Sequence, residues 1–443
     1  MISPHADMWV WSLPFTKVSL DTFMKGSSIP YPAHSANTTR ANDDPSSVVS
    51  CGDMKMEHEA PFPKDRARIA VIRRHWMIVP RRYAYWSGLI CFFLGFMCST
   101  AWNARSTVSL RNYIHMTALS LHHPPPPTVL VTGGLGFIGS HVVEDLTQHG
   151  FHVVVMDDMS NGRNFDVARN ASAVLLKDIT HLNDFSAIST RIDYVVHLAA
   201  AISVVESISQ PDKYHHVNVD GSRHVLEWAK RHKVKRVVAA STSSIYGDVS
   251  AELMPLKEES ATGGISPYAT TKFDMEHLME AYSANGLPTT ALRIFNVYGP
   301  RQDPSSPHSG VVSYFMDQAF LGTDGRLEIT GDGEQYRDFI YVKDVAVAIR
   351  LAMLSSDPHF DAFNVCTGTK TTINALAQEI LETCASGAAI EYKERRPGDV
   401  RESVCDPTKA EVKLGFAAQY SYEDGIAATW AWILDRRRRR RRE

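Results

Sequence analysis

A glycine-rich turn, set between an apolar run and a helical pattern, constrains this 443-residue chain more than any other feature. Residues 129–131 predict a β-strand, and an amphipathic pattern typical of a helix begins at Val142. Gly133, Gly136 and Gly139 lie between them. Glycine lets backbone N–H groups approach a pyrophosphate closely at the positive end of a helix. The order of strand, glycine turn and helix therefore predicts a dinucleotide site.

An acidic residue follows the next predicted strand. The apolar run 153–156 ends at Asp157, eighteen residues after Gly139. A carboxylate at this position can accept hydrogen bonds from both hydroxyls of an adenosine ribose, and it would repel a 2′-phosphate. The sequence therefore predicts NAD as the cofactor, in preference to NADP.

Apolar runs alternate with helical patterns through the next part of the chain, at 174–176, 194–198 and 236–240. This alternation is typical of βαβ units and of a parallel sheet covered on both faces. From about residue 299 the pattern loosens into shorter segments broken by proline and glycine. We expect an α/β fold: a Rossmann-type doubly wound parallel sheet with a smaller C-terminal α/β substrate-binding lobe. The NAD part would cover about 128–298, and the lobe mainly about 299–435.

Composition narrows the functional class. The 44% apolar content and the net charge of −3 are typical of an ordinary α/β protein and argue against nucleic-acid binding. The six cysteines show no spacing typical of metal ligands, so we expect structural thiols and no metal site. They are Cys51, Cys91, Cys98, Cys366, Cys384 and Cys405.

The chain before the glycine turn has a different character. Residues 1–82 show no sustained periodicity and are predicted to form a disordered, basic N-terminal region. Residues 83–104 carry no charge and are long enough to cross a bilayer core of about 30 Å. More arginines precede this segment than follow it, and the positive side stays in the cytosol. We therefore expect a single-pass ER or Golgi membrane anchor with a lumenal catalytic domain. The alternative is a buried hydrophobic helix in a cytoplasmic protein.

The remaining boundaries follow from composition. Residues 105–127 form a polar stem and a Pro-rich linker, and the folded domain covers 128–435. Residues 436–443 form a polyarginine tail, which either binds anionic surfaces or is simply solvated.

Three residues predict catalysis. Tyr268 and Lys272 lie four residues apart and so share one face of a helix. A cation one turn away favours the phenolate, which would lower the tyrosine pKa from about 10. Thr242 ends a predicted strand and could relay a proton between a substrate hydroxyl and the tyrosine. Taken alone, Tyr268 and Lys272 could instead be a tyrosine and a lysine on the protein surface without a catalytic role.

Several ordered motifs resemble the extended short-chain dehydrogenase/reductase family, an NAD-dependent epimerase/dehydratase group. The resemblance covers about 128–435 and is greatest for the nucleotide-sugar 4-epimerases of the UDP-glucose 4-epimerase group. It rests on the glycine turn, on Tyr268 with Lys272, and on the segments 178–179, 197–200, 218–221, 241–247, 293–300, 331–333, 337–341 and 396–399.

The resemblance implies a set of site residues. The catalytic residues would be Thr242, Tyr268 and Lys272. The NAD-binding residues would be Gly133, Gly136, Phe137, Ile138, Gly139, Asp157, Asn161, Asp178, Ile179, Leu198, Ala199, Ala200, Asn218, Tyr268, Lys272 and Phe295. The UDP-sugar substrate would be bound by Thr242, Asn296, Arg337, Arg396, Asp399 and Ser403. The family also implies a homodimer.

The implied reaction is 4-epimerisation of a UDP-hexose through a 4-keto intermediate. Ser403, beside the C2 substituent in the resemblance, would leave room for an N-acetyl group. Ser243 and Ser244 follow Thr242 where a 4,6-dehydratase is expected to carry an acidic pair, which argues against that activity. A UDP-glucuronate decarboxylase, a UDP-glucuronate 4-epimerase and a non-catalytic NAD-binding scaffold remain alternatives.

Overall fold

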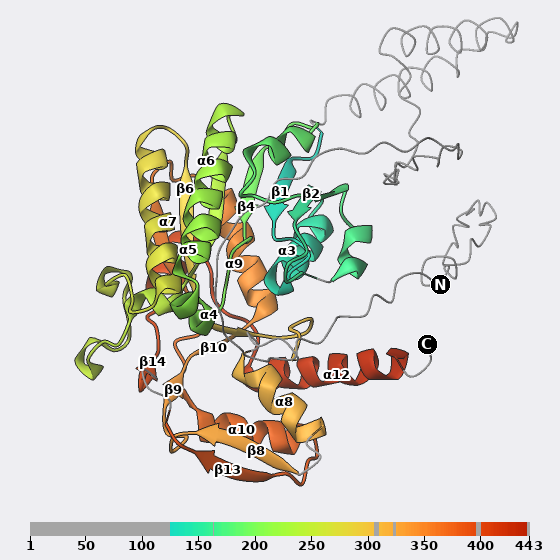
Figure 1. Cartoon of the computed structure of the whole chain (residues 1–443), viewed down its shortest axis with the longest axis vertical. Coiled ribbons are helices and arrows are strands. Elements are labelled where there is room, and N and C mark those ends of the chain that lie inside the picture. Colours follow the sequence, from blue (N-terminus) through green and yellow to red (C-terminus); the bar gives the residue numbers. More distant parts are fainter. Residues whose placement is uncertain (1–124, 163, 305–309, 322–324, 396–399, 441–443) are drawn as a thin grey trace, which may run out of the picture. The chain divides into compact units, whose positions relative to one another are not determined.

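The computed structural model describes residues 125–162, 164–304, 310–321, 325–395 and 400–440 (Figure 1). All of them belong to one compact unit, Asn103–Glu443. The predicted regions 1–82 and 83–104, most of the stem, and the last three residues of the arginine tail lie outside the described residues.

The main sheet has seven parallel strands in the order β11-β6-β5-β4-β1-β2-β3, which confirms the expected Rossmann-type α/β fold. The central strand β1 pairs with β2 on one side and β4 on the other, so that Thr132 is level with both Met156 and His197. The strands are β1 (Thr128–Thr132), β2 (His152–Asp157), β3 (Ala173–Leu176), β4 (Tyr194–His197), β5 (Arg236–Thr242), β6 (Thr289–Ile294) and β11 (Asp361–Val365).

Helices cover both faces of this sheet (Figure 1). On one face, α3 (Phe137–Gln148) and α9 (Val342–Leu354) pack in a core that includes Val129 and Val131 of β1. On the other face, the core around Leu130 contains residues of α6 (Gly221–Arg231) and α7 (Pro267–Ala284). Successive residues of β1 thus enter opposite cores, as the two-residue repeat of a strand requires.

The connection before α6 contains shorter turns. Helices α4 (Val204–Ser209) and α5 (Pro211–His215) lead into a π-helical turn, η4 (His216–Asp220), which runs directly into α6. The described 3₁₀ segments are η2 (Phe165–Arg169), η3 (Leu182–Ala187), η5 (Ser243–Tyr246), η6 (Ala251–Leu253) and η7 (Glu258–Ser260).

The smaller lobe combines short sheets with helices around its own core, which includes Phe315, Leu376 and Ile426. The chain leaves the lobe at α9 and β11 to complete the main sheet, then returns to it. Its two-stranded sheets pair β8 (Arg326–Thr330) with β13 (Ala389–Lys393), and β7 (Asn296–Tyr298) with β10 (Phe339–Tyr341). Its three-stranded sheet contains β12 (Thr371–Thr372), β9 (Tyr336–Arg337) and β14 (Glu402–Ser403). The remaining helices are α8 (Val311–Leu321), α10 (Ile373–Thr383), α11 (Thr408–Leu414) and α12 (Tyr422–Arg440).

Helix α12 includes the start of the arginine run. Arg437 lies over the Phe320 ring, 3.8 Å from its centroid, and forms a 3.2 Å ion pair with Asp317. Residues 436–440 continue helix α12, and the packing involves the first two of these arginines.

Two of the cysteines are not free thiols, which corrects the sequence-based prediction. Cys366 and Cys405 form a disulfide, with Cα atoms 6.4 Å apart across a sequence separation of 39. Cys384 is free, and Cys51, Cys91 and Cys98 lie outside the described residues. The two partners come from distant segments, so no local spacing could have indicated the bond.

The prediction of a single-pass ER or Golgi membrane protein with a lumenal domain is also corrected. Among the described residues, no helix combines the length and the apolar composition needed to cross a bilayer. The segment 83–104, on which the prediction rested, lies outside them.

A buried ion pair joins α7 to β6. Arg293 donates from Nη2 to Glu276 over 2.7 Å, and both side chains are at most 7% exposed. Arg293 also donates from Nη1 to the Tyr246 hydroxyl, which in turn donates to Asn364 on β11. Hydrogen bonds to each partner offset the cost of burying these charges.

We expect Arg293→Met to lower the free energy of unfolding by about 3–5 kcal/mol, because it leaves Glu276 charged and buried without its partner. Arg231→Met is the matched control: its 2.8 Å pair with Glu227 lies on the surface of α6, so the loss there should stay below about 1 kcal/mol. Urea unfolding of both variants measures the difference. If both variants lost the same free energy of unfolding, the buried ion pair would contribute no more to stability than the surface pair.

Candidate active site

The glycine turn at the end of β1 has the backbone that a pyrophosphate site needs. Gly133 has a φ of +69°, and a Cβ there would lie 2.7 Å from the amide nitrogen of Ala199. A Cβ on Gly139 would overlap the carbonyl oxygen of Gly133. Helix α3 begins at Phe137, and no side chain caps its first turn. Its N-terminal N–H groups and positive dipole end are suited to bind an anion.

Asp157 lies at the carboxyl end of β2, beside this turn, and is 5% exposed. Its carboxylate accepts hydrogen bonds from the Leu135 amide over 2.9 Å and from the Met159 amide over 2.8 Å. Burial raises the pKa of this carboxyl, and the two amides partly oppose the rise. Each oxygen retains a lone pair, so Asp157 can still accept ribose hydroxyls while it fixes the turn.

The other residues expected at the adenosine half are spread along the same edge of the sheet. Asn161 is exposed, whereas Ile179 is buried in contact with the backbone of Gly221. Asp178 accepts a 2.8 Å hydrogen bond from the Thr180 amide and is half-buried. Leu198, Ala199 and Ala200 follow β4 and are also half-buried, as are Phe137 and Ile138 at the start of α3.

Asn218 is buried, and its side-chain amide forms hydrogen bonds with other residues of the protein. Its Oδ1 accepts from the Ala201 amide over 2.8 Å, and its Nδ2 donates to the Ala201 carbonyl and to Thr271 Oγ1. These bonds fasten η4 to the segment after β4 and to α7. Asn218 therefore supports the site, and a direct contact with NAD stays a prediction.

The three predicted catalytic residues lie on two neighbouring elements. Thr242 ends β5, and its hydroxyl is hydrogen-bonded to that of Ser244 over 3.2 Å. Tyr268 lies near the start of α7, close enough for the Thr242 side chain to lower its pKa. Pro267 and the Ser266 cap, which accepts from the Ala269 amide, fix where α7 begins. Lys272 follows one turn later and is 4% exposed. Ser241, beside Thr242, has a buried hydroxyl that lacks a hydrogen-bond partner among the described residues.

The electrostatics correct one expectation. Burial raises the pKa of Tyr268, and the Thr242 side chain opposes it only in part; the expected lowering by Lys272 is not seen. Burial also lowers the pKa of Lys272 to about 8, while Glu276 raises it in part. Its charge, added to burial, lowers the pKa of His197 to about 3. His197 is thus neutral at physiological pH, and Lys272 is the ionisable cation nearest the tyrosine along α7.

Three of the expected substrate residues meet around Asp338, which the sequence analysis did not single out. Asn296 donates from Nδ2 to the Asp338 carbonyl over 2.9 Å, and the Asp338 amide donates to the Ser403 carbonyl over 3.0 Å. Arg337 precedes Asp338 and is level with Ser403 in the pairing of β9 with β14. Of the other three expected residues, Thr242 lies at the end of β5, and Arg396 and Asp399 lie outside the described residues.

The Asp338 carboxylate is fully buried and strongly hydrogen-bonded. It accepts from the Thr367 amide and hydroxyl and from the Gly368 amide, over 2.7–2.9 Å. Burial raises its pKa, and these bonds together with the Cys405 amide lower it in part. The only sequence signal was an acidic residue inside an otherwise apolar segment after Arg337.

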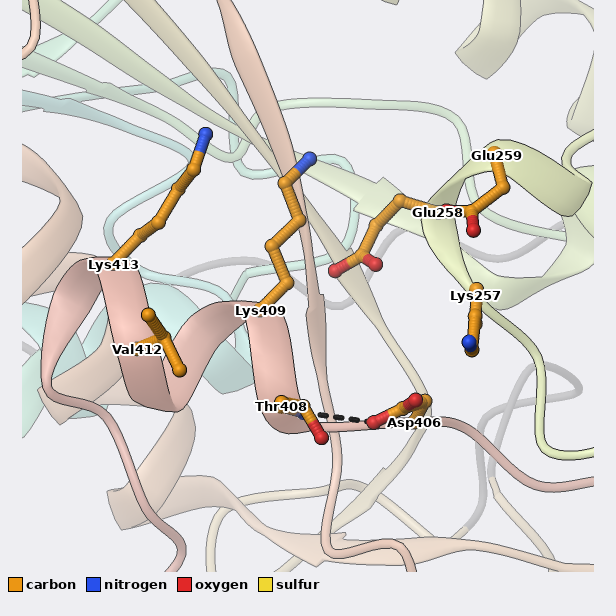
Figure 2. Close-up of a pocket in the computed structure, with 8 residues that line it drawn as sticks. All are labelled: Lys257, Glu258, Glu259, Asp406, Thr408, Lys409, Val412 and Lys413. Atoms are coloured by element: carbon orange, nitrogen blue, oxygen red, sulfur yellow. Dashed lines mark hydrogen bonds between the residues drawn. The ribbon is translucent and has the colours of Figure 1, made fainter.

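A charged surface depression lies away from these residues (Figure 2). Lys409 and Lys413 both form ion pairs with Asp361, and Asp406 accepts from the Thr408 amide over 3.0 Å. Its lining contains none of the expected catalytic, NAD-binding or substrate-binding residues. The chemistry therefore belongs to the carboxyl ends of the main strands, where ligands bind in open α/β sheets.

A sequence model of the NAD dependent epimerase/dehydratase family matches residues 129–366, more than half of the chain. The chain belongs to this family. A crystal structure of UDP-glucose 4-epimerase from Thermotoga maritima with UDP-glucose is similar, with 38% identity and a TM-score of 0.66; the match covers 70% of this chain and 99% of that one.

Two further relatives differ in their named activities. UDP-N-acetylglucosamine 4-epimerase from Methanobrevibacter ruminantium, in complex with UDP-N-acetylmuramic acid, is 35% identical with a TM-score of 0.65, over 71% of this chain and 100% of that one. UDP-N-acetyl-alpha-D-glucosaminuronate decarboxylase from Bacillus cytotoxicus is 31% identical, over 69% of this chain and 97% of its own length. The epimerase/dehydratase described here is therefore an NAD-dependent enzyme of nucleotide-sugar chemistry.

The site fits NAD, the cofactor of the family. The close backbone at Gly133 leaves no room for a side chain, the first turn of α3 offers N–H groups, and Asp157 offers a buried carboxylate. Tyr268 and Lys272 would lie at the other end of the bound cofactor.

We expect Gly139→Ala to weaken NAD binding at least about tenfold, because the added methyl collides with the Gly133 backbone and displaces the turn. Gly387→Ala is the control, since a Cβ there meets nothing within 4 Å. Calorimetric titration of cofactor-free protein with NAD measures the change. Unchanged affinity in Gly139→Ala would show that the turn does not hold the cofactor.

The lowered pKa of Lys272 predicts a pH dependence of stability. Between about pH 8 and 10 the folded chain binds fewer protons at this residue than the unfolded chain, so its contribution to stability increases with pH. The free energy of unfolding of the wild type, minus that of Lys272→Met, should therefore increase by about 1 kcal/mol per pH unit across this window. Urea unfolding at several pH values measures this difference. A difference that stays constant with pH would contradict the lowered pKa of Lys272.

Proposed function

We propose that this enzyme catalyses the NAD-dependent 4-epimerisation of a UDP-hexose. The observation that carries the proposal is the placement of Thr242, at the end of β5, beside Tyr268 on α7, with the buried Lys272 one turn farther along that helix. A tyrosine beside a threonine hydroxyl can exchange a proton with a sugar hydroxyl, and a scaffold that only bound NAD would not need this arrangement.

The proposed reaction begins with oxidation at C4 of the hexose. Tyr268 takes the proton of the 4-hydroxyl, directly or through Thr242. Because burial opposes the phenolate and Lys272 does not lower the pKa of Tyr268, the base function of Tyr268 depends on further positive charge in the loaded site. Bound NAD supplies the hydride acceptor and afterwards the hydride donor. Tyr268 returns the proton once the 4-keto sugar has turned its other face, which inverts C4.

The substrate end of the site favours a nucleoside diphosphate. Arg337 supplies a planar guanidinium, the group best suited to bind phosphate oxygens with several hydrogen bonds. Asn296, anchored through its Nδ2 to the Asp338 carbonyl, retains an amide oxygen and a second N–H. Arg396 and Asp399 would complete the contacts with diphosphate and uridine ribose.

Substrate range depends on Ser403. A serine beside the C2 substituent would accept an N-acetyl group, so we propose activity on N-acetylated UDP-hexoses as well as on UDP-glucose and UDP-galactose. The similarity to an enzyme named for UDP-N-acetylglucosamine supports this range. A homodimer stays a prediction from the family.

A decarboxylase of a UDP-uronic acid is the second candidate. It is favoured by the similarity to the Bacillus cytotoxicus enzyme. Ser243 and Ser244 after Thr242 argue against a dehydratase, because neither can act as the acid that expels water.

One experiment separates these candidates. The full chain, loaded with NAD, is incubated separately with UDP-glucose, UDP-galactose, their N-acetyl analogues and UDP-glucuronate, and the products are resolved. Interconversion within a hexose pair supports the epimerase. Release of carbon dioxide from UDP-glucuronate would replace it with the decarboxylase, and no conversion of any substrate would favour a scaffold.

We expect Tyr268→Phe to lower kcat by at least about a hundredfold, since only the phenolic oxygen exchanges the proton. NAD affinity should stay within about twofold of the wild type, which calorimetry checks in parallel. Tyr282→Phe, at a partly exposed tyrosine near the other end of α7, is the control. Near wild-type turnover by Tyr268→Phe would remove the base assignment.

A further inference from the structure

The Cys366–Cys405 disulfide connects the two parts of the molecule. Cys366 directly follows β11, the edge strand of the main sheet, and Cys405 comes two residues after the end of β14 in the lobe. Each residue is 1% exposed, and both belong to a cluster that includes Tyr246, Leu256 and Phe295. The bond therefore lies in the packed junction between the sheet and the lobe.

The strand on the lobe side is poorly held by its own pairing. Strand β14 has only two residues, and it lies at the edge of a sheet whose other members are equally short. Outside the ladder, the Tyr336 amide donates to the Arg401 carbonyl and the Asp338 amide to the Ser403 carbonyl, each over 3.0 Å, and a backbone bridge joins Leu256 to Cys405. A strand this short contributes little stability alone, so other constraints must fix Ser403.

Asp338 links the disulfide to the expected substrate residues. Its carboxylate accepts hydrogen bonds from Thr367 and Gly368, the two residues directly after Cys366, and the nearby Cys405 amide helps to lower its pKa. Its backbone binds the Asn296 side chain and the Ser403 carbonyl. A change in the spacing of the two cysteines would therefore shift the segments that carry these groups.

The glycine turn is not part of this network. It follows β1, which is separated from β11 by β4, β5 and β6 in the sheet order. Asp157 lies still farther along the sheet, at the end of β2. A change at the disulfide should thus leave the adenosine half of the cofactor site undisturbed.

Asp338, Cys366 and Cys405 also form a group whose ligand atoms lie within 4.8 Å of one another, all of them buried. A metal ion would need the carboxylate oxygens and both thiolates. The oxygens already accept three hydrogen bonds, and the sulfurs are bonded to each other. This arrangement suits a covalent link rather than a metal centre.

We propose that the Cys366–Cys405 disulfide is a positioning device for substrate: it fixes β14 and the Asp338 network, so that the UDP-sugar is bound in a preformed site. This inference rests on the proposed function. Closure of the bond converts two thiols into one S–S bond, and a low-molecular-weight disulfide takes up the two electrons and two protons and becomes two thiols. A preformed site lowers the entropy cost of ordering the protein when the UDP-sugar binds. Loss of the disulfide should therefore raise the KM for the UDP-sugar before it changes the affinity for NAD.

The test compares the same full chain with and without the bond. The wild type is produced in an oxidising and in a reducing host cytosol, and peptide mapping after alkylation establishes the state of each cysteine. Cys405→Ala removes the bond in a second way. Cys384→Ala, at the free and partly exposed cysteine of the lobe, is the matched control. KM and kcat for UDP-glucose and the Kd for NAD are measured for all four proteins.

We expect KM to increase at least about threefold in the reduced wild type and in Cys405→Ala, with the Kd for NAD unchanged within about twofold. Cys384→Ala, produced in the oxidising host, should match the oxidised wild type. The proposal is overturned if no peptide linking Cys366 and Cys405 is found in the oxidised protein. It is equally overturned if KM is the same with and without the bond, or if NAD affinity falls together with substrate affinity.

A failure of the proposed function gives a different result. If none of the proteins converts a UDP-sugar, calorimetric titration with UDP replaces KM. Weaker UDP binding in the reduced protein then supports the positioning role although the reaction is another one. If the oxidised protein does not bind UDP, the proposed function and the inference that rests on it both fail.

Discussion

One buried carboxylate, that of Asp338, determines how the substrate lobe meets the main sheet. Its oxygens accept hydrogen bonds from the segment that follows β11, while its own backbone binds Asn296 and Ser403. An ionised carboxylate in an apolar interior is costly unless several donors surround it. The segments that supply these donors are therefore held in one arrangement, which is also the arrangement that gathers the expected substrate residues.

At the catalytic end of the site, burial favours the uncharged forms of the two ionisable residues. Burial raises the pKa of Tyr268 and lowers that of Lys272, so each group is pushed toward its neutral form. Ionisable groups with such shifts are frequent where proton transfer occurs, because a modest change in surroundings then changes their protonation. Glu276, one turn beyond Lys272 in the same helix and paired with Arg293 of β6, partly opposes the effect of burial by raising the pKa of the lysine.

Local patterns predicted much of this molecule. The strand, glycine turn and helix around Gly133, the carboxylate of Asp157, and the pairing of Tyr268 with Lys272 depend on spacing within short segments, and the structure places them as expected. Contacts between distant segments could not be predicted in this way. The role of Asp338, the buried partner of Arg293 and the Cys366–Cys405 bond each join residues far apart in sequence. The pKa of Tyr268 was misjudged for a related reason, since burial is a property of the folded chain.

The late position of β11 has a consequence for synthesis. Strand β6 ends at Ile294, but the strand that covers its open edge begins only at Asp361, after much of the lobe. At a ribosomal rate of about 5–20 residues per second, the edge of β6 stays uncovered for roughly 3–13 seconds. Its residues 289–294 are entirely buried in the finished fold, so during this interval the nascent chain exposes the unpaired backbone N–H and C=O groups of this strand edge to other chains. The interleaving of lobe and sheet thus leaves one pairing edge open to other strands until most of the lobe has been synthesised.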